Sequence, residues 1–208
     1  MVSPILQGVH FLPWEGAHFR QQTVRLLLLG ESHHSTEPTE PATMTIDCTR
    51  AYVEGTWSHK YWTEIMKVVE GKDYWEIDRA MFWSKISFYN YIQEIVGEGP
   101  GIAPTSQMHN SSEQGLASVL AHLKPTHVLV LAKRLWHSLP QSIYVTNSDI
   151  KFGGDARETK LFVCSGNSMA LGTWLPHPSY PFHFNAKRLH PVVRDFLSTE
   201  ISCDRSGR

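Results

Sequence analysis

The chain has 208 residues, with 19 Lys and Arg against 20 Asp and Glu, which gives a formal net charge of −1. This length predicts a single domain, spanning residues 1–208, with a substantial core. The near-neutral charge excludes a globally basic nucleic-acid-binding protein, so any affinity for nucleic acid must come from a local basic face. Three distant cysteines, Cys48, Cys164 and Cys203, argue against a disulfide framework and against a CxxC metal site.

The N-terminal sequence MVSPILQGVHFLPWEG lacks a cationic start followed by a long apolar run. No segment of the sequence reaches the roughly 18 consecutive apolar residues that a membrane span needs. We therefore expect a soluble, cytoplasmic protein with no membrane partner and with reduced thiols.

The first half of the chain carries one clear strand and one clear helix. Residues 24–29 are a continuous aliphatic run, which is typical of a parallel strand covered on both faces, and Gly30 ends it. Residues 61–69 have apolar side chains at helical spacing, with Gly71 as a stop. Residues 82–96 mix both periodicities, so a helix or a short strand is possible there, before the breaker GEGPGIAPT.

The second half alternates helices with strands. Ser111 and Gln114 have the spacing of a capping box ahead of a helix that Pro125 closes. HVLVLA, at residues 127–132, predicts a second buried strand, and SIYV and KLFV predict two short ones. Residues 186–197 predict a closing amphipathic helix. This alternation predicts an α/β fold, a three-layer α/β/α sandwich with a central, mostly parallel sheet.

The loop GESHH, residues 30–34, directly follows the first predicted strand. In this class of fold, ligands gather at the carboxyl ends of the strands, so the loop occupies a position suited to a functional site. Its polar side chains either take part in catalysis or merely cap the segment that follows. They belong to Glu31, Ser32, His33 and His34.

The segment WLPHPSYPFHF, residues 174–184, holds His177 between Pro176 and Pro178, which restrict the backbone around it. A neutral histidine held in this way can donate a hydrogen bond to a developing oxyanion. The alternative is a proline-stiffened surface turn in which the histidine is incidental.

Asn90 lies between aromatic residues in the segment SFYNYIQ. A buried asparagine offers one acceptor and two donors, which is the set needed to read the edge of a pyrimidine or of an amide-bearing ligand. The alternative is an asparagine whose hydrogen bonds are satisfied within the core.

These motifs follow one another in a recognisable order. GESHH comes after a buried strand, and then come the aromatic-flanked Asn, a Gly/Pro-rich loop, a helix, the strand HVLVLAKRLW, and HPS before a last helix. In this order and spacing the chain resembles the uracil-DNA glycosylase superfamily, over residues 24–197. The resemblance implies the α/β/α fold of that superfamily and its activity, hydrolysis of the bond between a flipped-out base and its sugar.

In that superfamily the first motif reads GQDPYH, GxNPG or GEAPG, and it supplies the residue that positions or activates the attacking water. Gly30 matches its glycine, and Glu31 matches the acid of the GEAPG branch. Ser32 falls where the other branches have their catalytic aspartate or asparagine. His33 replaces the proline, and His34 stands where tyrosine or glycine is usual. The resemblance places Gly30, His33 and His34 among the substrate-binding residues.

The last motif, LPHPS at residues 175–179, is a closer match. The resemblance makes His177 the histidine that steadies negative charge on the departing base, and it places Ser179 among the substrate contacts. By the same resemblance Asn90 is the asparagine that reads the base.

The loop after HPS normally carries a wedge that enters the DNA helix as the nucleotide leaves it. Tyr180, Pro181 and Phe182 are the candidates here. Four cations are candidates for phosphate contacts, or else belong to an ordinary solvated face. They are Lys133, Arg134, Lys187 and Arg188. The GEAPG branch also holds an iron-sulfur cluster on four cysteines; because this chain has three scattered ones, we expect no cofactor and no metal.

We therefore expect a monomeric DNA glycosylase in which Glu31 activates water and His177 stabilises the leaving base. The changes at Ser32 and His33 indicate a modified base rather than plain uracil. A modified cytosine or thymine, as in the DNA of some phages, fits this change and would imply a role in antiviral defence.

Other functions stay open from the sequence. The chain could be a uracil or mismatch repair glycosylase, a serine-type hydrolase that uses Ser32 with a nearby histidine, or an inactive nucleic-acid-binding relic of the fold. A metal site on His33 and His34 is disfavoured, because adjacent histidines on an extended chain point to opposite faces.

Overall fold

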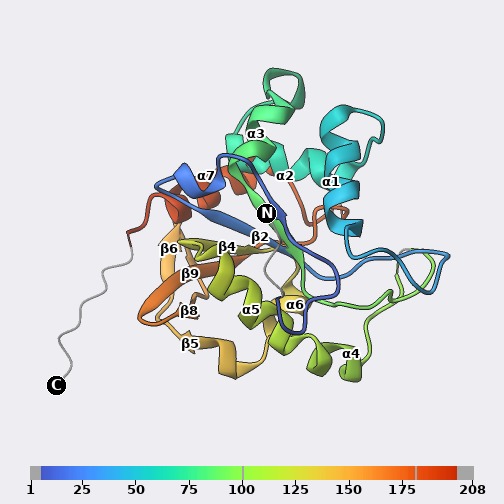
Figure 1. The fold of residues 1–208 in the computed structure, drawn as a ribbon. Helices are drawn as coiled ribbons and strands as arrows, with labels where there is room; N and C mark the ends of the chain where they lie inside the picture. Colours follow the sequence, from blue (N-terminus) through green and yellow to red (C-terminus); the bar gives the residue numbers. More distant parts are fainter. Residues whose placement is uncertain (1–5, 100, 181, 201–208) are drawn as a thin grey trace.

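The computed structural model describes residues 6–99, 101–180 and 182–200. Within them, the main sheet has seven strands in the order β1-β3-β2-β4-β9-β8-β5, and β6 and β7 form a separate small ribbon (Figure 1). The strands are β1 (Trp14–Glu15), β2 (Leu26–Gly30), β3 (Ser87–Asn90), β4 (His127–Val130), β5 (Tyr144–Thr146), β6 (Ile150–Phe152), β7 (Asp155–Arg157), β8 (Lys160–Ser165) and β9 (Ser168–Trp174).

The four central strands, β3, β2, β4 and β9, run parallel to one another. Antiparallel strands complete the sheet, with β1 beside β3 at one edge and β8 and β5 beyond β9 at the other. Every residue of β2 and β4 is buried, as expected for parallel strands covered on both faces. The prediction of an α/β fold with a mostly parallel central sheet is therefore confirmed.

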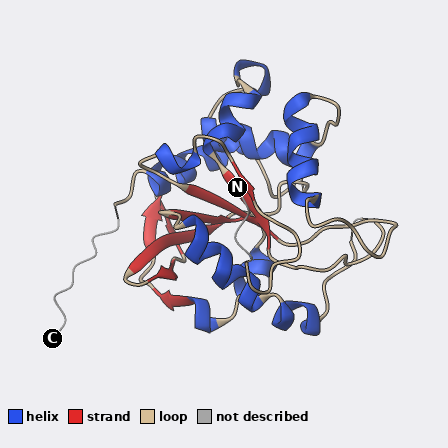
Figure 2. Cartoon of the chain, viewed as in Figure 1, coloured by secondary structure: helices blue, strands red, loops and turns tan. Residues whose placement is uncertain are grey.

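Helices cover both faces of the sheet (Figures 1 and 2). Because successive side chains of a strand point to opposite faces, Leu26 and Leu28 pack with helices α2, α3 and α7, whereas Leu27 and Leu29 pack with α5 and α6. The helices are α1 (Met44–Glu54), α2 (Lys60–Glu70), α3 (Arg79–Lys85), α4 (Ser106–Ser111), α5 (Glu113–Leu123), α6 (Lys133–Ser138), α7 (Ala186–Leu197), and the short 3-10 turns η1 (Phe19–Gln21), η2 (Tyr74–Glu76) and η3 (Gln141–Ile143).

Two predicted helices are confirmed. Helix α2 spans Lys60–Glu70 and ends at Gly71, whose φ of 70° is a left-handed conformation that glycine adopts without strain. Helix α7 spans Ala186–Leu197 as predicted, although Pro191 lies inside it.

The predicted capping box at Ser111 is wrong. Ser111 is the last residue of α4, and its hydroxyl donates to the carbonyl of Met108 at 3.1 Å and to the carboxylate of Glu94 at 3.0 Å. Helix α5 begins one residue later, after Ser112. The prediction that this helix ends before Pro125 is confirmed. Helix α5 ends at Leu123, and Lys124 follows in a left-handed conformation with φ of 47°.

Several elements were not predicted, and two of the central strands were missed or left open: β3 was offered only as an alternative to a helix, and β9 was not predicted. Residues 82–96 contain the end of α3 followed by β3, so the mixed periodicity reflects two elements rather than one. The central strand β9 escaped prediction because Gly172 and Thr173 interrupt its apolar residues. Gly172 is needed there, since a Cβ at this position would collide with the ring of Phe162 on β8.

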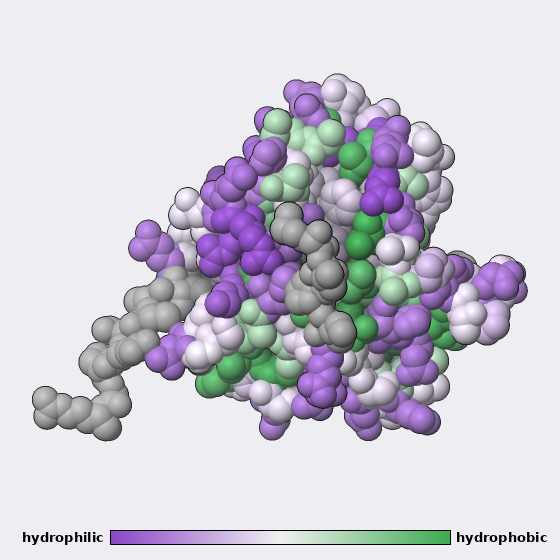
Figure 3. Space-filling model, viewed as in Figure 1, coloured by the Kyte–Doolittle hydropathy of each residue, from purple (hydrophilic) through white to green (hydrophobic). Residues whose placement is uncertain are grey.

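The surface has no uniform character on the face drawn in Figure 3, where hydrophilic and hydrophobic residues are interspersed. In the part of the chain that the structure describes, no helix has the length and apolar character needed to cross a membrane.

Candidate functional site

Polar or charged side chains lie at the end of each of the four parallel strands or shortly after it. Strand β3 ends at Asn90, and Glu31 directly follows β2. Arg134 lies in α6, shortly after β4, and His177 lies in the loop after β9. Because the carboxyl ends of parallel strands meet at one edge of the sheet, these four residues share one end of the fold. The structure therefore brings Glu31, Asn90 and His177 to one end of the sheet together with Arg134, which the sequence offered only as a candidate for phosphate contacts.

Gly30 and Asn90 are directly paired across β2 and β3. A Cβ at Gly30 would collide with Oδ1 of Asn90 and would lie 3.0 Å from the hydroxyl of Tyr61. The absence of a side chain at Gly30 is therefore what lets the Asn90 amide lie across this loop. The backbone holds the arrangement, because the N–H of Ile92 donates to the carbonyl of Glu31 at 2.8 Å.

His33 is buried next to the side-chain amide of Asn90. Its Nε2 is 3.1 Å from Asn90 Nδ2 and 2.8 Å from the hydroxyl oxygen of Thr45, and the ring meets that of Phe11 edge-on. Burial, with a smaller effect of His34, lowers the pKa of His33 to about 4, so the ring is neutral at neutral pH. The structure thus gives His33 a place as the support of Asn90.

Glu31 is buried and makes a two-point ion pair with Arg134. Arg134 Nε donates to Oε1 of Glu31 at 2.8 Å, and its Nη2 donates to Oε2. The Glu31 side chain is 8% exposed, whereas that of Arg134 is 56% exposed, so the guanidinium covers the carboxylate from the solvent side. This bidentate geometry fixes the position of the carboxylate and provides its counter-charge.

His177 is half-buried and held as a neutral donor. The backbone N–H of Ser179 donates to its Nδ1 at 3.2 Å, so the neutral ring carries its proton on Nε2. Burial lowers the pKa of His177; the charge of Glu31 opposes this shift, while that of Arg134 contributes to it. An Nε2–H group near an anionic Glu31 suits the stabilisation of negative charge on a leaving group.

Tyr61 links these groups, although the sequence indicated only a core position for it. Its ring centre lies 5.2 Å from that of His177, and its hydroxyl lies near Gly30. Burial and the nearby Glu31 raise the pKa of Tyr61, so the phenol stays neutral. The helical spacing of Tyr61 with other apolar residues concealed this role. The contact of Thr45 with His33 was also missed, because it joins residues from different elements.

The other predicted site residues lie at the margin. Ser32 is half-buried, and among the described residues it hydrogen-bonds to no histidine; the arrangement needed for a serine hydrolase thus lacks support. His34 and Ser179 are exposed. Tyr180 is 58% exposed, with its ring centre 5.4 Å from that of His177. Phe182 is 96% exposed, and Pro181 lies outside the described residues.

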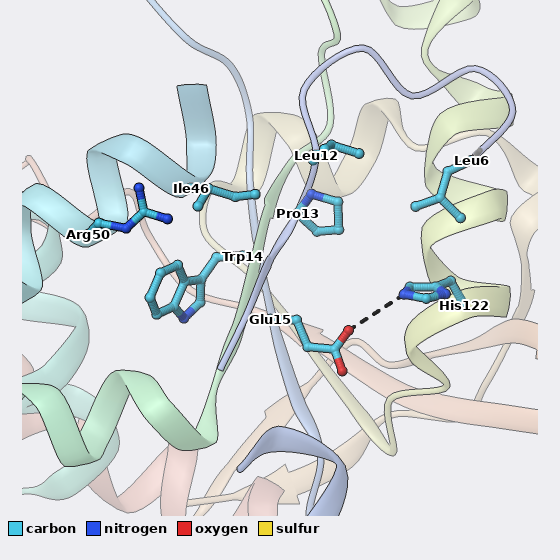
Figure 4. A pocket seen from close by; sticks show the side chains of 8 residues that line it. All are labelled: Leu6, Leu12, Pro13, Trp14, Glu15, Ile46, Arg50 and His122. Carbon is cyan, nitrogen blue, oxygen red and sulfur yellow. Dashed lines mark ion pairs between the residues drawn. The ribbon is translucent and has the colours of Figure 1, made fainter. Parts of the chain in front are cut away.

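Two hollows lie elsewhere on the molecule. One of about 310 Å³, beside β1, is lined by Glu15 and His122, whose Oε2 and Nε2 atoms are 3.5 Å apart (Figure 4). Since Glu15 pairs with Ser87, at the opposite end of β3 from Asn90, this hollow is distinct from the strand-end site. The other, of about 410 Å³, lies around the start of α2 and contains no strand-end residue.

Across the described ranges, no three His, Cys, Asp or Glu side chains gather closely enough to hold a metal ion. The groups described at the candidate site are the paired carboxylate of Glu31, the neutral imidazole of His177, the amide of Asn90 and the buried phenol of Tyr61. Comparison of the sequence with protein-family models and with curated proteins finds no match in either.

Proposed function

We propose that this chain is a DNA glycosylase of the uracil-DNA glycosylase type, with that superfamily's α/β/α fold. The observation that carries the proposal is the grouping of Glu31, Asn90 and His177 at the carboxyl ends of three parallel strands, around Tyr61. The chain order of these residues is that of the superfamily that the sequence resembles, with Glu31 matching the acid of its GEAPG branch.

The chemistry of base removal suits these groups. As the bond between C1′ of the sugar and the base nitrogen breaks, its electron pair moves to the base, and the sugar becomes cationic. Glu31 stabilises the cationic sugar and orients the water that adds to C1′, and the proton that this water loses ends on the departing base. His177 donates a hydrogen bond from Nε2–H to the anionic base until that proton arrives. Arg134 keeps the Glu31 carboxylate in one orientation throughout.

DNA is the proposed partner. Phe182 and Tyr180 would enter the helix as the nucleotide leaves it, which offsets the cost of about a few kcal/mol for unstacking the base. Both side chains are exposed in the loop that carries His177. Lys133, Lys187 and Arg188 are also exposed and free to approach the phosphate backbone.

The proposed substrate is a modified pyrimidine rather than plain uracil, because Ser32 and His33 replace residues of the first motif that the superfamily uses for catalysis and for shaping the pocket. A modified cytosine or thymine of phage DNA, removed as a defence, is consistent with this change. Repair of uracil or of mismatches is the second candidate.

The test uses the full chain and a panel of duplexes, each with one unusual base opposite its partner. Alkali treatment after incubation cleaves the strand wherever a base has been lost. We expect strand cleavage for at least one modified pyrimidine, and an approximately 100-fold slower rate for Glu31→Gln and for His177→Ala. His183→Ala, in an exposed residue of the same loop, serves as the control.

Three outcomes would overturn the proposal. They are the absence of cleavage on every base, full activity in both active-site variants, and tight DNA binding without base loss, which would indicate a relic that retained only affinity.

A further inference from the structure

The amide of Asn90 is held in one orientation. We propose that His33 is a specificity-determining residue that turns Oδ1 of Asn90 toward the substrate, so that the site selects a pyrimidine with an amino group at position 4 over one with a carbonyl there. This inference rests on the proposed glycosylase function and narrows its substrate to the cytosine class.

The donor end of the amide faces His33. Asn90 Nδ2 can only donate, and it lies 3.1 Å from His33 Nε2, so this nitrogen must be unprotonated to accept the bond. The lowered pKa of His33 agrees with a neutral ring, whose proton then lies on Nδ1. The hydroxyl oxygen of Thr45 lies 2.8 Å from the same nitrogen, so the Thr45 hydroxyl and the Asn90 amide share its single lone pair as donors.

The acceptor end of the amide faces the loop of the candidate site. Oδ1 occupies the space beside Gly30 where a Cβ would stand, on the side where the Tyr61 hydroxyl lies. Within the described residues, Oδ1 accepts no hydrogen bond, although Asn90 is only 6% exposed. Oδ1 is not among the fully buried side-chain atoms that lack a partner, so part of its surface stays accessible, and it can accept a hydrogen bond from a ligand that brings an N–H group.

The depth of Asn90 indicates which part of the base meets this acceptor. A flipped-out pyrimidine stays attached to DNA through N1, so the substituent at position 4, across the ring, enters deepest. Asn90 ends strand β3 and is more deeply buried than His177, which makes it the inner of these two polar groups. An amino group at position 4 donates to Oδ1, whereas a carbonyl there would place two acceptors in contact.

His33 makes this selection possible because an unsupported amide can rotate by half a turn. With Nδ2 turned toward the base, the same asparagine would accept a uracil or a thymine instead. By the proposed resemblance, His33 replaces the proline of the first motif, and a proline has no side-chain group that could hold the amide in this way.

The test compares release of 5-hydroxymethylcytosine and 5-hydroxymethyluracil from otherwise identical duplexes, under single-turnover conditions. The two bases share the substituent at position 5 and differ at position 4. We expect the wild type to favour the cytosine base by roughly 10- to 100-fold, the range expected for one mismatched polar contact. His33→Phe should bring this ratio toward 1, while His18→Phe, at an exposed histidine away from the site, should leave it unchanged.

A preference for the uracil base in the wild type would overturn the inference. An unchanged ratio in an active His33→Phe variant would also overturn it, with the glycosylase function intact. Release of neither base, nor of any other in the duplex panel, would instead overturn the proposed function.

A second measurement needs no activity and covers the case in which His33→Phe fails to fold. Nitrogen-15 NMR of histidine-labelled protein reports which ring nitrogen carries the proton. We expect Nε2 of His33 to show the shift of an unprotonated nitrogen and to change in Asn90→Ala. A protonated Nε2 would mean that the amide is turned the other way, which contradicts the inference.

Discussion

Arg134 and Glu31 join the ends of two adjacent strands, since the guanidinium that follows β4 donates to both carboxylate oxygens that follow β2. The carboxylate is buried, and its cationic partner is half exposed. Removing the cation therefore leaves an uncompensated negative charge in the site. The pair is thus expected to matter for stability as well as for the position of Glu31.

Arg134→Gln should lower the free energy of unfolding by about 1 to 2 kcal/mol, less than for a fully buried pair because Arg134 is partly solvated. Glu31→Gln in that background should recover part of the loss, since it removes the unpaired charge. Urea unfolding measures both. Arg194→Gln, which breaks the exposed pair with Asp195, is the control and should change stability by less than about 0.5 kcal/mol. Equal effects of Arg134→Gln and the control would contradict the prediction.

His177 should act through a single N–H donor. His177→Gln keeps a side-chain N–H group, and we expect it to retain more base release than His177→Ala, which should lose about 100- to 1000-fold. Rates under single-turnover conditions distinguish the two. If both variants lost activity equally, the ring itself rather than its donor would be what matters.

His33 should make stability depend on pH. Its pKa is about 4 in the folded chain and 6.5 when unfolded, so below pH 6.5 the unfolded state binds a proton that the folded state does not. The contribution of neutral His33 to the free energy of unfolding is complete above pH 6.5 and falls as the pH decreases from 6.5 toward 4. Between pH 7.5 and pH 5 the free energy of unfolding should fall by about 2 kcal/mol through His33 alone.

Urea unfolding of the wild type and of His33→Phe at both pH values measures this contribution. Four other histidines with lowered pKa values, His59, His109, His127 and His177, also contribute, so the comparison is the difference between the two proteins. The variant should lose less stability than the wild type on acidification. Parallel curves for the two proteins would mean that His33 is protonated in the folded chain.

Gly30→Ala should disturb the site through Asn90. The added Cβ would collide with Oδ1 of Asn90, and such overpacking typically costs about 1 to 3 kcal/mol. Asn90→Ala removes the obstacle, so the double variant should be more stable than the sum of the single effects predicts. A double-mutant cycle by urea unfolding tests this coupling, and simple additivity would contradict it.

The sequence predicted the parts of this site that depend on local pattern. Four leucines in succession indicate the buried strand β2, and Gly30 at its end indicates the loop that follows. The resemblance to a known motif order then indicated Glu31, Asn90 and His177. The structure places these residues at one end of the sheet, because they follow parallel strands.

The partners of these residues could not be predicted, because they depend on tertiary contacts. Arg134 lies 103 positions from Glu31, and nothing in the sequence near either residue indicates the pair. Thr45 and Asn90 approach His33 from different elements. Tyr61 looked like a core residue because its neighbours in α2 have helical apolar spacing, and it is buried as that pattern predicts while also facing the site.

Phe182 should matter for duplex DNA and not for folding. Its side chain is 96% exposed, so Phe182→Ala should change the free energy of unfolding by less than about 0.5 kcal/mol. If the ring fills the gap that the flipped nucleotide leaves, the variant should release the base from duplex DNA at least roughly 10-fold more slowly, with a smaller loss on single strands, where less unstacking is needed. Trp75→Ala, at another exposed aromatic residue, is the matched control. An equal loss on both kinds of DNA would assign Phe182 to substrate binding rather than to the opening of the helix.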